Sequence, residues 1–192
     1  MDALRTFTGN TEAEIWQQVA ADMAQRGEWF EYEAVLQQGG YEVYVAVDID
    51  LGGGFESGSE STTMTARLPR PVPLRFALHE QDWVHELGKL LGLTDIELGD
   101  PEIDAAFIIT TNEPATLHDL LADPDLRHTL LRYRDLRLVL KPTGSAPDEE
   151  AVLEFSKDTA LTDPAQLQDV YHLLLTLLQK LAPLPASTAA SL

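Results

Sequence analysis

The chain has 192 residues, of which 44% are hydrophobic and 23% are charged, so it is long enough and apolar enough for one globular domain and disorder is excluded for its bulk. Its formal net charge is −19, from 32 acidic and 13 basic side chains. This balance argues against nucleic acid and anionic membranes as direct ligands, because phosphate groups are bound by clustered cations.

An acidic surface of this kind suits high solubility or association with a basic protein partner. The absence of cysteine excludes disulfides, thiolate metal sites and thiol nucleophiles. The N-terminal residues lack the apolar core of a signal peptide, and no apolar run approaches the ~18 residues of a membrane span. We therefore expect a cytoplasmic protein, with a trimmed N-terminal signal as the open alternative.

The first predicted helix begins near Thr11 and ends at Gly27, with Thr11 and Glu14 spaced as a capping box. The segments 29–37 and 41–51 alternate apolar and polar residues on either side of a Gly-Gly pair. This pattern predicts two antiparallel strands with one wet face. Five carboxylates and a tyrosine stand at polar positions: Glu31, Glu33, Glu42, Asp48, Asp50 and Tyr44.

A stretch rich in glycine and serine, residues 52–61, predicts a flexible loop. The segments 62–68 and 74–79 predict a third and a fourth strand joined by a proline-rich connector, so that a meander is expected. Residues 80–91 predict an amphipathic second helix. Its buried face would carry Trp83, Val84, Leu87, Leu90 and Leu91.

A tight acidic turn, Gly99-Asp100-Pro101, follows that helix. Gly99 can take a positive φ, and Asp100 is pushed out of the α region by the proline after it, so the chain must turn a corner here. The apolar run from Ala105 to Ile109 predicts a short strand buried on both faces. Asp104 would stand where the chain enters the core, and an unpaired carboxylate there costs several kcal/mol.

The string GDPEIDAAFII is similar to a Gly-Asp-x-x-hydrophobic-Asp-x-x-Phe stretch in several uncharacterised bacterial domain families. In those families the acidic turn leads into a strand and then a helix with a Leu-Leu-x-Asp-Pro segment. Ile103 stands where they have phenylalanine, which leaves the packing role intact. The resemblance covers roughly residues 85–140 and implies no known activity. The Leu-Leu-x-Asp-Pro segment is matched by Leu120, Leu121, Asp123 and Pro124.

The segments 116–122 and 124–134 predict two further helices, the second one capped by Asp123. The segments 136–141 and 151–155 alternate again and predict a second hairpin.

Asp163 and Pro164 begin the last helix, 164–181. It is so apolar that it must be covered on most sides, either within the monomer or in a homodimer.

Because predicted hairpins lie next to each other instead of alternating with helices, the sequence favours an α+β fold over a doubly wound parallel one. We expect an antiparallel sheet built from hairpins, with helices packed mainly on one face. One domain would cover residues 1–183, and residues 184–192 would form a flexible tail.

No phosphate-binding loop, dinucleotide fingerprint, nucleophile elbow or HExxH motif is present. The metal candidates lie around the start of the second helix, and zinc accepts such side chains. The alternative is an ordinary surface helix, whose buried side is taken by its apolar residues. The candidate ligands are His79, Asp82, His85 and Glu86.

A series of carboxylates around the acidic turn offers a second site, for Ca²⁺ or Mg²⁺. Its spacing does not match an EF-hand loop. We favour structural roles, with Asp100 as a turn former and Asp104 as a cap for local backbone. The series consists of Asp95, Glu97, Asp100, Glu102 and Asp104.

Arg67, Arg70 and Arg75 are unusual neighbours in so acidic a chain. Held apart by prolines, they offer a fixed guanidinium surface for a carboxylate or phosphate ligand. The alternative is that each arginine pairs with an acidic residue across the sheet.

The sequence shows no arrangement of nucleophile, base and oxyanion donor. We therefore expect a non-enzymatic protein-interaction module without a cofactor, whose acidic surface or exposed sheet face engages a protein partner. The question of enzymatic activity stays open, and the alternative is a divalent-metal-binding protein or a metal-assisted hydrolase.

Overall fold

The computed structural model describes residues 4–27, 29–53, 57–80, 93–144 and 150–184. Within them the strands are β1 (Arg5–Gly9), β2 (Glu31–Gln38), β3 (Tyr41–Asp50), β4 (Ser59–Arg67), β5 (Phe76–His79), β6 (Thr94–Ile96), β7 (Ile108–Thr111), β8 (Leu136–Pro142) and β9 (Ala151–Lys157). The helices are α1 (Glu12–Arg26), α2 (Pro101–Ala106), α3 (Pro114–Leu120), α4 (Pro124–Arg132) and α5 (Pro164–Leu181).

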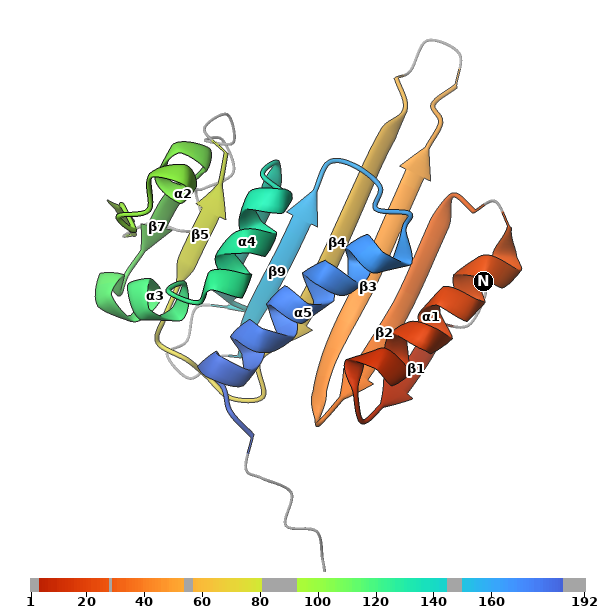
Figure 1. Ribbon diagram of the computed structural model, residues 1–192, viewed down its shortest axis with the longest axis horizontal. Coiled ribbons are helices and arrows are strands. Elements are labelled where there is room, and N and C mark those ends of the chain that lie inside the picture. Colours follow the sequence, from red (N-terminus) through yellow and green to blue (C-terminus); the bar gives the residue numbers. More distant parts are fainter. Residues whose placement is uncertain (1–3, 28, 54–56, 81–92, 145–149, 185–192) are drawn as a thin grey trace, which may run out of the picture.

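The strands of the described residues form one nine-stranded sheet in the order β1-β2-β3-β4-β9-β8-β5-β7-β6, and the helices lie on one of its faces (Figure 1). Neighbouring strands are antiparallel except for the pair β1 and β2. The predicted α+β class, with a mainly antiparallel sheet and helices on one face, is therefore confirmed. The opposite face of the sheet carries none of these helices.

The strand β1 is absent from the sequence prediction, and it pairs in parallel with β2. The helix α1 connects the two strands and brings the chain back across the sheet, which is the crossover that a parallel pair requires. Phe7 is the only large apolar side chain of β1. The local pattern is therefore too weak to predict this strand.

The helix α1 begins as predicted, because Thr11 and Glu14 form a capping pair. The N–H of Glu14 donates to Thr11 Oγ1 at 3.3 Å, and Glu14 Oε2 accepts from the N–H of Asn10 at 2.7 Å. Gly27, with a φ of 68°, follows the last turn. The buried stripe of α1 consists of Ile15, Trp16, Val19 and Met23.

Both predicted hairpins are confirmed. β2 and β3 are joined at Gly39 and Gly40, whose φ values of 59° and 88° lie in the left-handed region that favours glycine. β8 pairs with β9 along its whole length, from Leu136 to Pro142. In the first hairpin the buried side chains that face the helices are Tyr32, Ala34, Leu36, Tyr41, Val43, Val45 and Val47.

The predicted meander of the first four strands is wrong at its last step. β2, β3 and β4 are neighbours as expected, but β9 and β8 lie between β4 and β5. The C-terminal hairpin thus fills the centre of the sheet, where Phe155 of β9 stands between Met64 of β4 and Leu138 of β8. The third strand also begins earlier than predicted, at Ser59, inside the predicted loop.

The corner at Gly99 is confirmed by its φ of 74°, but the strand predicted from Ala105 is wrong at its start. Asp100 caps the short helix α2, which includes Ala105, and β7 begins only at Ile108. The strand β6, which pairs with β7, is also absent from the sequence prediction. α2 buries Ile103 alone, so its six residues give no helical period to recognise.

The helix α5 lies across the sheet, as Figure 1 shows, and is covered by its own chain. Asp163 caps it by accepting from the N–H of Ala165 at 2.9 Å, and Trp16 of α1 meets Tyr171 edge-on with 5.7 Å between ring centroids. The apolar stripe of α5 is thus buried within one protomer. It consists of Leu167, Val170, Tyr171, Leu173, Leu174, Leu175, Leu177 and Leu178.

Two predictions concern residues outside the described part of the chain. The helix expected over 80–91 falls almost wholly on residues 81–92, and the tail expected over 184–192 falls on 185–192. Leu184 is described, and its N–H donates to the hydroxyl of Tyr41 at 3.1 Å, while that hydroxyl donates to the carbonyl of Ala182 at 3.0 Å. The end of α5 is therefore tied to the start of β3.

Candidate interaction surface

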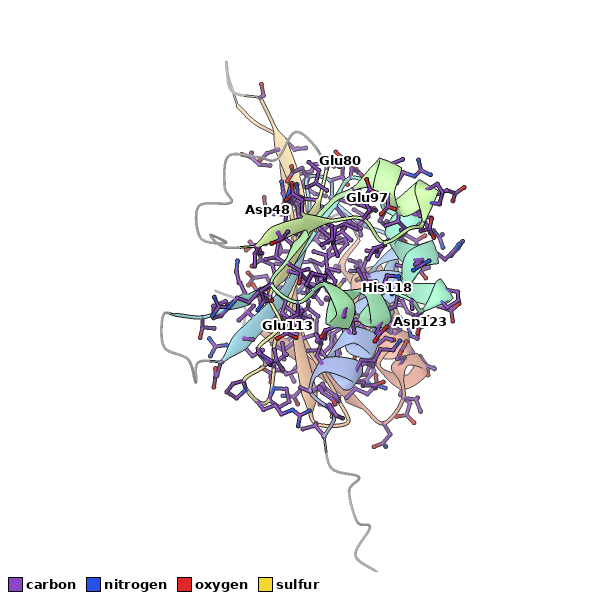
Figure 2. The ribbon with its side chains drawn as sticks, turned by 90° about the vertical axis from the view of Figure 1, so that its left-hand side faces the viewer. Asp48, Glu80, Glu97, Glu113, His118 and Asp123 are labelled. Carbon is purple, nitrogen blue, oxygen red and sulfur yellow. The ribbon has the colours of Figure 1, made fainter. Side chains whose placement is uncertain are left out.

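The side of β2, β3 and β4 that points away from the helices will be called the open face. Its members follow from the register, because successive side chains of a strand point to opposite sides of a sheet. Figure 2 shows the sheet from its edge, with Asp48 on the side away from the helices and with His118 and Asp123 on the helix side. The open face consists of Glu31, Glu33, Val35, Gln37, Glu42, Tyr44, Ala46, Asp48, Asp50, Ser59, Ser61, Thr63, Thr65 and Arg67.

The part of the open face on β2 and β3 is acidic. It carries Glu31, Glu33, Glu42, Asp48 and Asp50, while neither strand contains a lysine or an arginine. Glu31 and Asp48 are exposed and stand directly opposite each other in the register. Like charges in such cross-strand pairs destabilise a sheet, so the fold gains nothing from this arrangement.

Tyr44 stands at the centre of this acidic part. Its hydroxyl donates to Glu33 Oε1 at 2.5 Å. Partial burial and then the hydrogen bond to Glu33 raise the pKa of Tyr44 from its ordinary value of 10.0 to about 12. The phenol therefore stays a neutral donor at physiological pH, and its hydrogen bond fixes the position of the Glu33 carboxylate.

The neighbouring strands β8 and β9 differ in that their cations are paired. Lys141 Nζ lies 3.2 Å from Glu154 Oε2, and Arg137 forms an ion pair with Asp158 and a hydrogen bond to Ser156 Oγ at 3.0 Å. These charges cancel locally. Of these four strands, β2 and β3 therefore carry the uncompensated charge on this side of the sheet.

The predicted metal set is only partly within the described residues. His79 ends β5, is fully buried, and its Nδ1 lies 2.7 Å from the carbonyl oxygen of Glu80. Asp82, His85 and Glu86 lie outside the described residues, so their arrangement with His79 stays a prediction. Within the described ranges, no three His, Asp or Glu side chains are placed to hold a metal ion together.

The carboxylates of the acidic turn hold the backbone in the way that the sequence favours. Asp100 Oδ1 accepts from the N–H groups of Glu102 and Ile103 at 3.1 and 3.4 Å, and its other oxygen lies 3.0 Å from Arg127 Nη1. Asp104 Oδ1 accepts from the N–H of Leu98 at 2.7 Å. Asp100 and Asp104 thus hold the local backbone, and Asp100 also pairs with an arginine of α4. Asp95 of β6 and Glu97 after it are exposed.

The three arginines of the predicted anion site are all exposed. Arg67 lies 3.6 Å from Glu150 across the end of the sheet, as the pairing alternative proposes for it. The backbone of Arg75 is held by Asn112, whose Oδ1 accepts from the Arg75 N–H at 2.7 Å. Arg70 stands in the connector between β4 and β5.

Sequence reasoning finds the acidic face through its alternation but misses an open cavity at the far end of β3 and β4. This cavity has a volume of about 700 Å³. The sequence signal for it is faint, since Ile49 and Leu51 are the only apolar residues among those that line it. The cavity is lined by Ile49, Asp50, Leu51, Gly58, Ser59, Glu60, Ser61 and Asp158.

Comparisons with known proteins gave no match, whether with family models, with curated proteins or with solved structures. In the described part of the chain, no helix has the length and apolar character needed to cross a bilayer.

Proposed function

We propose that this chain is a non-enzymatic protein-interaction module, whose acidic open face binds a basic protein partner. The observation that carries the proposal is the exposed pair of Glu31 and Asp48, which stand opposite each other on adjacent strands. The two negative charges repel each other, which lowers the stability of the fold, and a cation placed between the two side chains relieves the repulsion. The partner that fits is therefore one that brings lysine or arginine to a flat sheet surface.

The rest of the acidic face supports the same partner. Glu33 and Glu42 extend the negative charge along β2 and β3, and Tyr44 adds an aromatic side chain of the kind that is enriched in protein interfaces. A field of one sign also speeds the encounter with an oppositely charged protein at low salt. We place this interaction in the cytoplasm, as the sequence predicts.

The test is a variant in which Glu31, Glu33 and Glu42 are all replaced by lysine. Used as bait with cell extract, the unchanged protein is expected to retain a partner that salt elutes, and the variant is expected to lose it. With the partner purified, its affinity should fall about tenfold or more at low salt, and less at high salt, because exposed charges are screened. Titration calorimetry at two ionic strengths measures both values.

A matched control carries lysine at Glu97, Glu102 and Asp119, three exposed carboxylates away from the open face. It makes the same change in net charge, so it separates a local contact from a general attraction between opposite charges. Thermal unfolding of both variants checks that the fold is kept. Equal loss of the partner by the two variants, or no loss by either, contradicts the proposal.

A further inference from the structure

Strands β3 and β4 continue past the helices and form the projecting end of the molecule (Figure 1). β3 and β4 are paired out to Asp50 and Ser59. The other neighbour of β4 stops earlier, because β9 ends at Lys157, which pairs with Thr62. Among the described residues, the stretch 59–61 of β4 thus has a strand on one side only. On the other side, the segment after β9 contacts β4 through the side chains of Glu60 and Thr62, which accept from the N–H groups of Ala160 and Leu161. A strand edge that no other strand pairs with offers backbone N–H and C=O groups.

The open cavity of about 700 Å³ lies beside this edge. Its apolar part is Ile49 and Leu51, and Leu51 is 71% exposed. Phe30 stands next to them, since its carbonyl oxygen accepts from the N–H of Ile49 at 2.7 Å, and it is 51% exposed. Large exposed hydrophobic residues are few in the described chain, namely Leu4, Phe30 and Leu51, and Leu51 is the one that lines the cavity.

The cavity is also acidic. Asp50 Oδ1 accepts from the N–H of Gly52 at 2.9 Å and Glu60 Oε2 accepts from the N–H of Ala160 at 3.2 Å, which fixes both side chains. Neither carboxylate has an ion-pair partner within the described residues. Asp158 differs, because its charge is compensated by Arg137. The net charge of the cavity is thus negative. It comes from Asp50 and Glu60, which point to opposite faces of the sheet.

Small residues keep the edge accessible. Ser59 of β4 pairs with Asp50 of β3, and Gly58, which precedes Ser59, lies next to Leu51. A Cβ atom on Gly58 would come within 2.5 Å of the carbonyl oxygen of Asp50, so the close approach of the two strands requires glycine. Without a side chain there, Leu51 is open to a ligand that runs along β4.

We propose that this end of the hairpin binds an extended, basic segment of a protein partner, which adds as a strand along residues 59–61 of β4. Backbone pairing at a free edge supplies affinity, and neighbouring side chains select the sequence. Lysine or arginine side chains of the segment reach Asp50 and Glu60, and an apolar side chain packs on Leu51. This inference rests on the proposed function and names a second contact for the same basic partner.

The probe is a fluorescent peptide of alternating lysine and valine, compared with a peptide in which proline replaces every second valine. Proline cannot donate a backbone hydrogen bond, so it blocks strand addition while the charge is unchanged. The unchanged protein is expected to bind the first peptide and to bind the second about tenfold more weakly, as measured by fluorescence anisotropy. Equal binding of the two peptides, or binding of neither, overturns the inference.

Two variants locate the site. The pair Asp50→Asn and Glu60→Gln removes both charges and keeps both hydrogen-bond acceptors, and it should weaken binding of the lysine–valine peptide about tenfold. Leu51→Ser alters an exposed side chain and should weaken it about threefold. Full binding by both variants, whose folds are checked by thermal unfolding, overturns the inference.

The failure of this inference is distinguishable from failure of the proposed function. If lysine at Glu31, Glu33 and Glu42 abolishes capture of the basic partner while the cavity variants capture it fully, the open face alone is the binding site. The cavity proposal is then wrong and the proposed function stands. If the cavity variants lose the peptide while the face variant keeps the partner, the open face is not the binding site, and the basic partner binds at the strand edge alone.

Discussion

Replacement of Asp100 by alanine is expected to lower the free energy of unfolding by about 2–3 kcal/mol. One part is the loss of the N-cap of α2, where Asp100 accepts from Glu102 and Ile103. The other is the loss of the partner of Arg127, since the side chains of Asp100 and Arg127 are each only 24% exposed. Urea unfolding followed by circular dichroism measures the change.

The size of this effect follows from what Asp100 connects. Arg127 of α4 also donates from Nε to the carbonyl of Leu121 at 2.6 Å, so its guanidinium joins the acidic turn to the loop between α3 and α4. Without the carboxylate, a half-buried cation is left beside a helix terminus that has lost its cap. The partly buried position makes the charge more costly than an exposed one.

Two further variants separate the two parts. Asp100→Asn keeps a good capping side chain and loses the charge, so it should cost less than alanine, about 1 kcal/mol. Arg127→Met keeps the packing of the aliphatic stem, and a double-mutant cycle with Asp100→Asn isolates the ion pair. An Asp100→Ala protein as stable as the unchanged one contradicts the structural role of the turn.

The structural role of Asp100 can be predicted from the sequence because it depends only on the residues next to it in the chain. A residue before proline, after glycine, and two residues before a helical N–H gives a turn and a cap with little choice. The same is true of Thr11, Asp123 and Asp163, whose capping bonds are all present. The alternation of β2 and β3 is equally local, and it carries the acidic face with it.

The features that the sequence does not predict depend on contacts between residues far apart in the chain. The insertion of β8 and β9 between β4 and β5 is decided by which apolar faces fit together in the assembled core. The sequence of β5 does not indicate which strand it pairs with. β1 pairs with β2 only because α1 places it there. The free edge of β4 likewise depends on where β9 ends, at Lys157. The cavity beside it has only a faint signal in the sequence of the segments that line it.

Alkaline pH is expected to destabilise the protein strongly, because four of its five tyrosines have raised pKa values in the fold. Burial is the largest cause at each of them. It raises the pKa of Tyr44 and Tyr133 to about 12, with added contributions from the hydrogen bonds to Glu33 and Asp169. The pKa values of Tyr32 and Tyr171 are also raised, with Asp22 and Glu12 as the nearby charges.

The sign follows from linkage between protonation and folding. A tyrosine in the unfolded chain ionises near 10.0, whereas the folded protein keeps these phenols neutral to higher pH. The stability that they contribute is fully present below pH 10 and is lost as pH rises through about 10 to 12. Thermal unfolding midpoints measured across this range should therefore fall with increasing slope.

Two measurements assign the loss to the tyrosines. Phenolate absorbance at about pH 11 should be much lower in the folded protein than in the same protein unfolded in urea. The variant Tyr171→Phe cannot ionise at that position, so its stability relative to the unchanged protein should rise as pH increases above 10, even though it loses the hydrogen bond to Gln38 Oε1. Equal phenolate in the folded and unfolded states would show that burial does not protect these rings, and the packing of α5 against the first hairpin would then be looser than its contacts indicate.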